Sequence, residues 1–71
     1  MVRLYFDFEG VRVLYAVMDA ATVAGVNLDL MKLHGVEFIG RNGAYIYAKM
    51  SRTAFNLLRP IFEVMPKNYP F

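Results

Sequence analysis

Residues 36–50 constrain the fold of this chain most strongly, because apolar and polar side chains alternate on both sides of an Asn42-Gly43 dipeptide. Alternation with a period of two is typical of a strand with one buried face. Asn-Gly favours a two-residue type I′ turn, in which both central residues have positive φ. The segment therefore predicts a β-hairpin with strands over residues 36–41 and 44–50.

A helix is expected directly after this hairpin. Ser51 can act as its N-cap, and the pattern continues to Met65. Apolar residues recur there at spacings of three and four: Ala54, Phe55, Leu58, Ile61, Phe62 and Met65. Pro60 lies inside the segment and removes one backbone hydrogen bond, so we expect a kink, or a break with Pro60 as the first residue of a second short helix.

The first half of the chain shows the same plan. Residues 2–8 alternate as a strand, Glu9-Gly10 can turn the chain, and residues 11–17 continue as a second strand. Asp19 is a candidate N-cap for a helix that runs to about Leu33. Gly35 suits the left-handed position that follows a helix end.

These elements predict one small α+β domain, ββαββα, over residues 1–71, with residues 66–71 as a non-helical tail. The simplest layout is a four-stranded antiparallel sheet in the order 2-1-3-4, with both helices packed on one face. Strand alternation then assigns ten residues to the helix-covered face: Val2, Leu4, Phe6, Phe8, Val11, Val13, Val17, Phe38, Ile46 and Met50.

Self-association is expected from composition. Apolar residues make up 58% of the chain and its mean hydropathy is +0.35, which is more than one small core can bury. A homodimer is the simplest cover for the excess. In the expected order, the strand over residues 44–50 lies at an edge and could pair with a second chain.

The opposite face of the sheet is the predicted contact surface. Tyrosines alternate there with basic residues, an arrangement that can stack unpaired bases and neutralise phosphates. Leu14, Ile39 and the acids Asp7 and Glu37 fall on the same face and suit a protein partner better. The predicted partner-binding residues are Arg3, Tyr5, Arg12, Arg41, Tyr45, Tyr47 and Lys49.

Catalytic and metal-binding motifs are missing from the sequence. The chain has no cysteine and a single histidine, His34, and its six carboxylates show no metal-ligand spacing. We therefore expect no enzyme activity, no cofactor and no metal. Asp19, Asn27 and Asp29 interrupt the apolar residues 13–31 and argue against a membrane span, and the absence of cysteine fits a cytoplasmic location.

The function expected from these features is that of a small binding protein without catalytic activity. It self-associates and acts by occupying another macromolecule, a protein in the first instance, in the manner of a regulator or inhibitor. The alternative is a nucleic-acid-binding module that uses the Tyr- and Arg-rich sheet face. The net charge of +2 permits nucleic-acid contact without demanding it.

Overall fold

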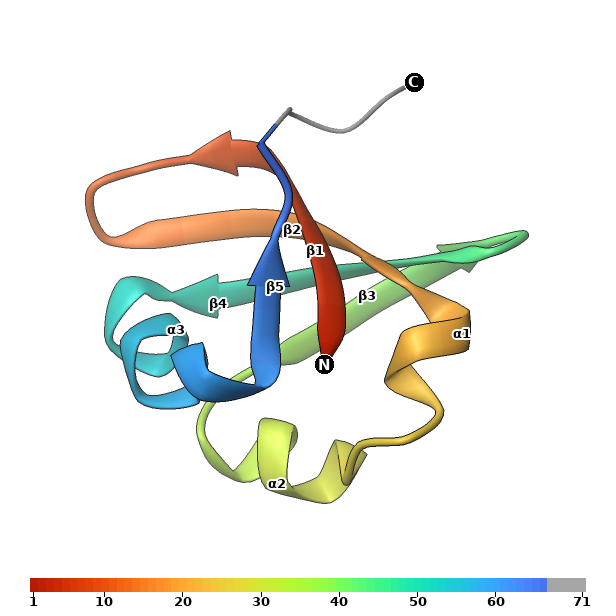
Figure 1. Ribbon diagram of the computed structural model, residues 1–71. Helices are drawn as coiled ribbons and strands as arrows, with labels where there is room; N and C mark the ends of the chain where they lie inside the picture. The colour runs from red at the N-terminus through yellow and green to blue at the C-terminus, as the bar shows by residue number, and fades with distance from the viewer. Residues whose placement is uncertain (67–71) are drawn as a thin grey trace.

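A mixed five-stranded sheet forms the frame of the computed structural model, which describes residues 1–66 (Figure 1). The elements follow in the order β1 (Val2–Glu9), β2 (Val13–Asp19), α1 (Ala20–Val23), α2 (Leu28–Leu33), β3 (Glu37–Asn42), β4 (Tyr45–Ser51), α3 (Arg52–Leu58), the 3-10 helix η1 (Arg59–Ile61) and β5 (Phe62–Val64). The expected α+β class is confirmed. The tail predicted for residues 66–71 lies, apart from Pro66, outside the described residues.

The strand order is β3-β4-β2-β1-β5, so the predicted order 2-1-3-4 is wrong. β4 pairs with β2 over seven residues and lies inside the sheet, which leaves β3 and β5 as the edges. Four residues of β2, Leu14, Ala16, Val17 and Met18, are buried. A strand with buried residues on both faces is stable in the middle of a sheet and would expose apolar surface at its edge.

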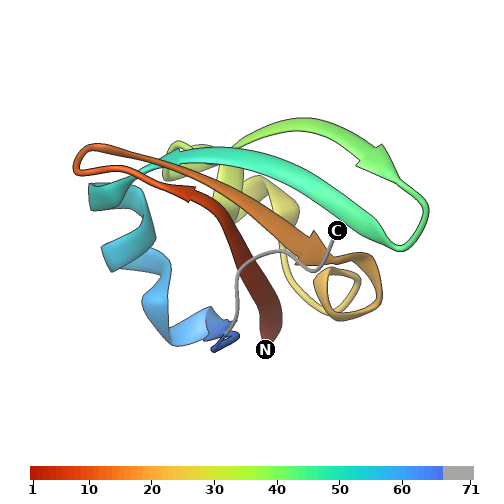
Figure 2. The ribbon, with the colours of Figure 1, turned by 90° about the horizontal axis from the view of Figure 1, so that it is seen from above.

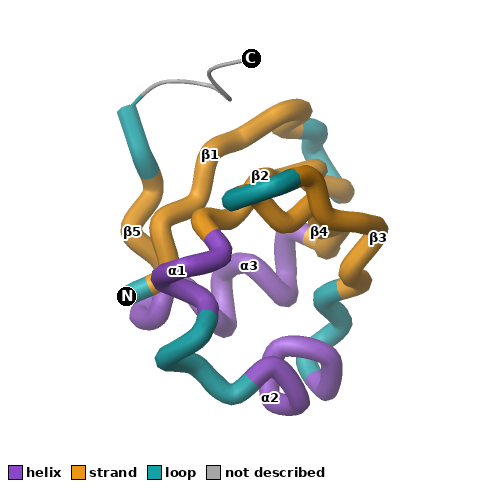
Figure 3. The backbone as a smooth tube through the Cα atoms, turned by 90° about the vertical axis from the view of Figure 1, so that its right-hand side faces the viewer, coloured by secondary structure: helices purple, strands orange, loops and turns teal. Residues whose placement is uncertain are grey.

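All three α-helices lie on one side of the sheet (Figures 2 and 3). The core between the layers contains Leu4 from β1, Met18 from β2 and Met50 from β4, all at most 1% exposed. The helices contribute Val23, Met31, Ala54, Phe55 and Leu58. The helix-covered layer was therefore predicted correctly in kind, with three short helices in place of two longer ones.

The β1–β2 hairpin differs from its prediction in both turn and faces. A three-residue loop, Gly10 to Arg12, joins the strands, and the Gly10 N–H donates to the Val13 carbonyl at 2.9 Å. β2 therefore starts at Val13, and its side chains predicted to face the helices lie on the opposite face of the sheet. Its core-facing residues are Leu14, Ala16 and Met18, whereas Val11, Val13 and Val17 are outside the core cluster.

A bulge in β1 adds a second change of face. Phe6 pairs with Ala16 but Phe8 pairs with Tyr15, so the ladder shifts at Asp7. Phe6 packs against the core, while Phe8 is 58% exposed and its ring lies beside that of Tyr15. Period-two alternation breaks at such a bulge, which is why Phe8 was wrongly assigned to the covered face.

Arg52, the first residue of α3, holds the β1–β2 loop in place. Its backbone N–H donates to the Arg12 carbonyl at 2.9 Å, and its side chain donates to the carbonyls of Val11 at 3.0 Å and Gly10 at 2.8 Å. Glu9 lies 3.6 Å from the same guanidinium. The loop is thus tied to a helix that begins some 40 residues later in the chain.

The β3–β4 hairpin was predicted more accurately. Ile46, Ala48 and Met50 face the core, and Tyr45, Tyr47 and Lys49 face away from it, as expected. The turn is one residue further along than predicted, since Asn42 pairs with Tyr45 and the central residues are Gly43 and Ala44. Only Gly43 has positive φ, +60°, which matches a type II′ turn and corrects the type I′ prediction.

The long helix expected from Asp19 to Leu33 is divided into α1 and α2. Asp19 caps α1 as predicted, and Asn27 caps α2 by accepting from the N–H groups of Asp29 and Leu30. α2 ends at Leu33, and Gly35 (φ +100°) follows it in a Schellman motif. The Gly35 N–H donates to the Lys32 carbonyl and the Val36 N–H donates to the Met31 carbonyl. The capping residue Asn27 restarts the helix and so divides it.

The predicted helix to Met65 stops early. Ser51 caps α3 as expected, because its side-chain oxygen accepts a hydrogen bond from the Ala54 N–H at 3.0 Å. α3 ends at Leu58, and Pro60 lies in η1, so the helix breaks at the proline. β5 then pairs in parallel with β1, with Phe62 buried opposite Val2, and this fifth strand replaces the predicted helical continuation.

Candidate functional site

The sheet face opposite the helices carries an array of aromatic residues, and we call it the outer face. One row across the strands is Phe8, Tyr15, Lys49 and Glu37, and the next is Tyr5, Val17, Tyr47 and Gly40. A third row contains Asp19, Tyr45 and Asn42. None of the helices within residues 1–66 covers this face (Figure 2).

Contacts between side chains occur both between rows and within a row. The rings of Tyr5 and Tyr45 meet edge to face with centroids 6.3 Å apart, and those of Phe8 and Tyr15 lie 6.2 Å apart. The Lys49 ammonium lies 5.9 Å from the centre of the Tyr15 ring. Val17, in the middle of the array, is fully buried although it lies outside the core cluster. The outer face therefore carries several large rings, two pairs of which are in contact.

Both charge signs occur on the outer face. Lys49 is opposite Glu37 in the β3–β4 ladder, and Arg3 is opposite Glu63 in the β1–β5 ladder. Each cation thus has a carboxylate directly beside it on the neighbouring strand. Such pairing lowers the positive potential that a phosphate backbone would need, and it provides complementary charges for a protein surface.

Five of the seven predicted contact residues come together on this face: Arg3, Tyr5, Tyr45, Tyr47 and Lys49. Arg12 is exposed in the β1–β2 loop, away from the rows. Arg41 pairs with the core-facing Ile46, so its side chain belongs to the helix side of β3. A bulge at Ile39 shifts the β3 register and moves Arg41 away from the face expected for it.

Phe8 and Tyr15 are members of the outer face that sequence reasoning missed. The bulge in β1 and the three-residue loop bring them there, and neither feature leaves a clear pattern in the sequence. Tyr15 could have been found from its type, because a partly exposed tyrosine is common on a strand that faces a partner.

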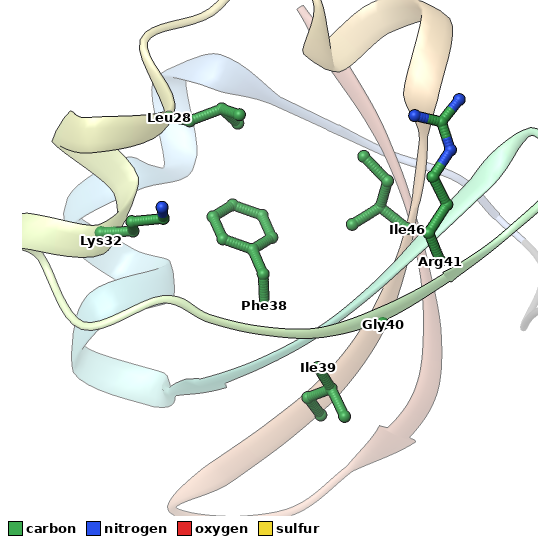
Figure 4. Close-up of a pocket in the computed structure, with 7 residues that line it drawn as sticks. All are labelled: Leu28, Lys32, Phe38, Ile39, Gly40, Arg41 and Ile46. Carbon is green, nitrogen blue, oxygen red and sulfur yellow. The ribbon is translucent and has the colours of Figure 1, made fainter.

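A groove between α2 and β3 is the second surface feature. Its cavity volume is about 370 Å³, and its lining consists of Leu28, Lys32, Phe38, Ile39, Gly40, Arg41 and Ile46. Figure 4 shows Phe38 and Ile46 pointing into it between Lys32 and Arg41, while Ile39 points to the other side of β3. Sequence analysis did not predict this groove, because the separation of α2 from β3 arises only in the folded chain.

The described part of the chain contains no group of three or more His, Asp or Glu side chains placed to hold a metal ion. His34 is the exposed C-cap residue of α2. Within residues 1–66, no helix has the length and apolar character needed to cross a membrane.

No family model, curated protein sequence or solved structure gave a significant match.

Proposed function

We propose that this chain is a protein-binding module without catalytic activity, of the regulator or inhibitor type, that self-associates through the outer face of its sheet. The observation that carries the proposal is the array of aromatic residues on a face that no helix of residues 1–66 covers. Tyrosine and arginine are the residues most enriched at energetically important interface positions. A second copy of the chain is the partner that best fits the composition.

Charge distribution supports a protein partner over a nucleic acid. Arg3 and Lys49 are each beside an acid, Glu63 and Glu37, so the face offers alternating signs. A two-fold axis can place the acid of one copy against the cation of the other, because both copies present the same pattern. Nucleic-acid binding instead draws most of its affinity from unopposed cations.

The size of the molecule sets the expected strength of the dimer. Its Cα atoms span 26 × 25 × 21 Å, so one broad face is on the order of 600 Å². A standard interface buries about 800 Å² from each partner. We therefore expect a dimer with a dissociation constant in the micromolar range, in equilibrium with monomer.

Sedimentation over a concentration series tests the proposal. The wild-type chain should change from monomer to dimer, and the double variant Tyr45→Ala/Tyr47→Ala should weaken dimerisation at least about tenfold, since losing two interface tyrosines exceeds 1.4 kcal/mol. Its circular-dichroism spectrum should stay close to that of the wild type. A protein that stays monomeric at every concentration would refute self-association.

The matched control is Leu33→Ala/Leu57→Ala, which removes two apolar side chains that are 80% and 62% exposed on the helices. This variant should dimerise like the wild type.

Labelled single- and double-stranded oligonucleotides, titrated across a salt series, test the rival function. Tight binding at low salt that weakens steeply as salt rises would favour the nucleic-acid module over the protein-binding one.

A further inference from the structure

The edge strand β3 and the groove beside it form a site separate from the outer face. β3 is the last strand of the sheet on its side, and five of its six residues are exposed. An edge strand presents unpaired backbone N–H and C=O groups to any chain that approaches in extended form. The other edge, β5, has only three residues.

The groove supplies apolar contact at the same edge. Phe38 from β3, Ile46 from β4 and Leu28 from α2 line it, and the first two also pack against the core. Its volume of about 370 Å³ can accept one large apolar side chain with its flanking backbone. Leu28 is 40% exposed, which leaves part of this surface without cover in the described chain.

Two cations lie at opposite ends of the groove, and no acid lines it. Lys32 is on the α2 side and Arg41 near the far end of β3 (Figure 4). Within residues 1–66, neither forms an ion pair with a carboxylate. The Arg41 Nε donates to the Gly43 carbonyl at 3.0 Å, which holds the guanidinium in place at the hairpin turn.

We propose that this groove binds an extended acidic peptide segment, which adds to the β3 edge as a further strand. Alternate residues of a strand point the same way and are about 7 Å apart. A large apolar residue can therefore pack on Phe38 while a carboxylate two residues away reaches Lys32 or Arg41. Backbone pairing provides the binding mode, and the apolar pocket and two cations select the sequence.

Three fluorescein-labelled hexapeptides are suitable probes. In each peptide, Thr alternates with residues that should face the groove. The central groove-facing residue is Leu, Phe or Trp, which distinguishes the three peptides, and the next groove-facing residue is Asp. Fluorescence anisotropy should show saturable binding of at least one peptide. Replacing its Asp with Lys should weaken binding at least about tenfold, because like charges would then meet. If none of the three peptides binds at a protein concentration of about 1 mM, any affinity is too weak to matter and the proposal is overturned.

Charge reversal in the protein tests the role of the two cations. Lys32→Glu/Arg41→Glu should lose the acidic peptide and bind its Lys counterpart more tightly than the wild type does. The control, Arg12→Glu/Arg59→Glu, makes the same net charge change at exposed positions outside the groove lining and should keep the preference of the wild type. Equal binding of the acidic peptide by both double variants would contradict the proposal.

Backbone N-methylation tests strand addition. Successive amides of an added strand point alternately toward β3 and away from it, so methylation of one should abolish binding and methylation of the next should be tolerated. Equal affinities for the two methylated peptides would exclude strand pairing.

Binding of decanoate in the groove, with no binding of any peptide, would identify an amphipathic small molecule as the occupant and overturn the peptide proposal.

This site is independent of the proposed dimer. The groove is on the helix side of β3, whereas the aromatic array is on the other face of the sheet. The Lys32→Glu/Arg41→Glu variant should therefore dimerise like the wild type in sedimentation, and Tyr45→Ala/Tyr47→Ala should still bind the peptide.

Discussion

The two β-hairpins of this chain have similar lengths but different surroundings. β1 and β2 lie inside the sheet, between β4 and β5, whereas β3 and β4 extend to its edge. β2 has four buried residues, while five of the six residues of β3 are exposed. The inner hairpin thus carries most of the stability, and the outer hairpin offers accessible surface for binding.

The turns of the two hairpins differ in the same way. The β1–β2 loop depends on a side chain from elsewhere in the chain, because Arg52 donates to the carbonyls of Gly10 and Val11. The β3–β4 turn is mainly local, formed by Gly43 at positive φ, although the Ala44 carbonyl also accepts from the Ala20 N–H at 2.8 Å. The β1–β2 loop therefore depends on a contact with α3, whereas the β3–β4 turn depends mainly on its own residues.

The largest difference between the hairpins should appear on truncation of their apolar residues. Leu14→Ala in β2 removes a fully buried side chain and should cost about 3 kcal/mol of unfolding free energy. A domain of this size has on the order of 5 kcal/mol in total, so the variant should keep about 2 kcal/mol and remain mostly folded in the absence of denaturant. Ile39→Ala in β3, where the side chain is 56% exposed, should cost at most about 0.5 kcal/mol.

Urea denaturation, followed by circular dichroism, measures both unfolding free energies. The protein concentration should be well below the one at which the dimer forms, so that only monomer unfolding is observed. Similar costs for Leu14→Ala and Ile39→Ala would contradict the division into a stabilising and an accessible hairpin.

The next effect concerns the loop of the inner hairpin. Arg52→Ala removes two side-chain hydrogen bonds to the loop and should cost about 1 kcal/mol. Arg52→Lys keeps a positive charge near Glu9 but loses the forked geometry, so it should recover little of this. The ion pair itself adds little, since both side chains are substantially exposed.

Hydrogen exchange of the Gly10 amide, which donates to the Val13 carbonyl, locates the effect in the loop when it is followed by NMR. Arg12→Ala is the matched control, because that side chain is exposed in the same loop and should leave stability unchanged. If the Gly10 amide of Arg52→Ala exchanged as slowly as in the wild type, the loop would not depend on the Arg52 hydrogen bonds.

The same contrast explains how much of the fold followed from the sequence. In β4 only one face is apolar enough to be buried, so alternation assigned Tyr45, Tyr47 and Lys49 correctly. In β2 both sets of alternate residues are apolar, and a one-residue change in loop length reverses their faces. Caps at Asp19 and Ser51 were predictable because they depend on local hydrogen bonds.

Strand order and the binding groove depend on contacts between distant segments. The pairing of β5 with β1 joins residues about 60 positions apart, and no periodic pattern in a three-residue strand announces it. The bulges at Asp7 and Ile39 moved Phe8 onto the outer face and Arg41 off it. Five of the seven predicted contact residues still share the outer face, since they lie on segments where alternation was unbroken.

The smallest effect tests whether the conformation of the β3–β4 turn is set by Gly43 itself. Gly43 has φ +60°, so Gly43→Ala should cost about 1 kcal/mol from strain in the left-handed region. Gly40 in β3 has no positive φ and open space around an added Cβ, so Gly40→Ala should be neutral or stabilise by up to about 0.5 kcal/mol through the unfolded state. Urea midpoints of the two variants should therefore move in opposite directions or differ clearly. Equal midpoints would mean that docking of Ala44 onto α1, and not the glycine, sets the turn.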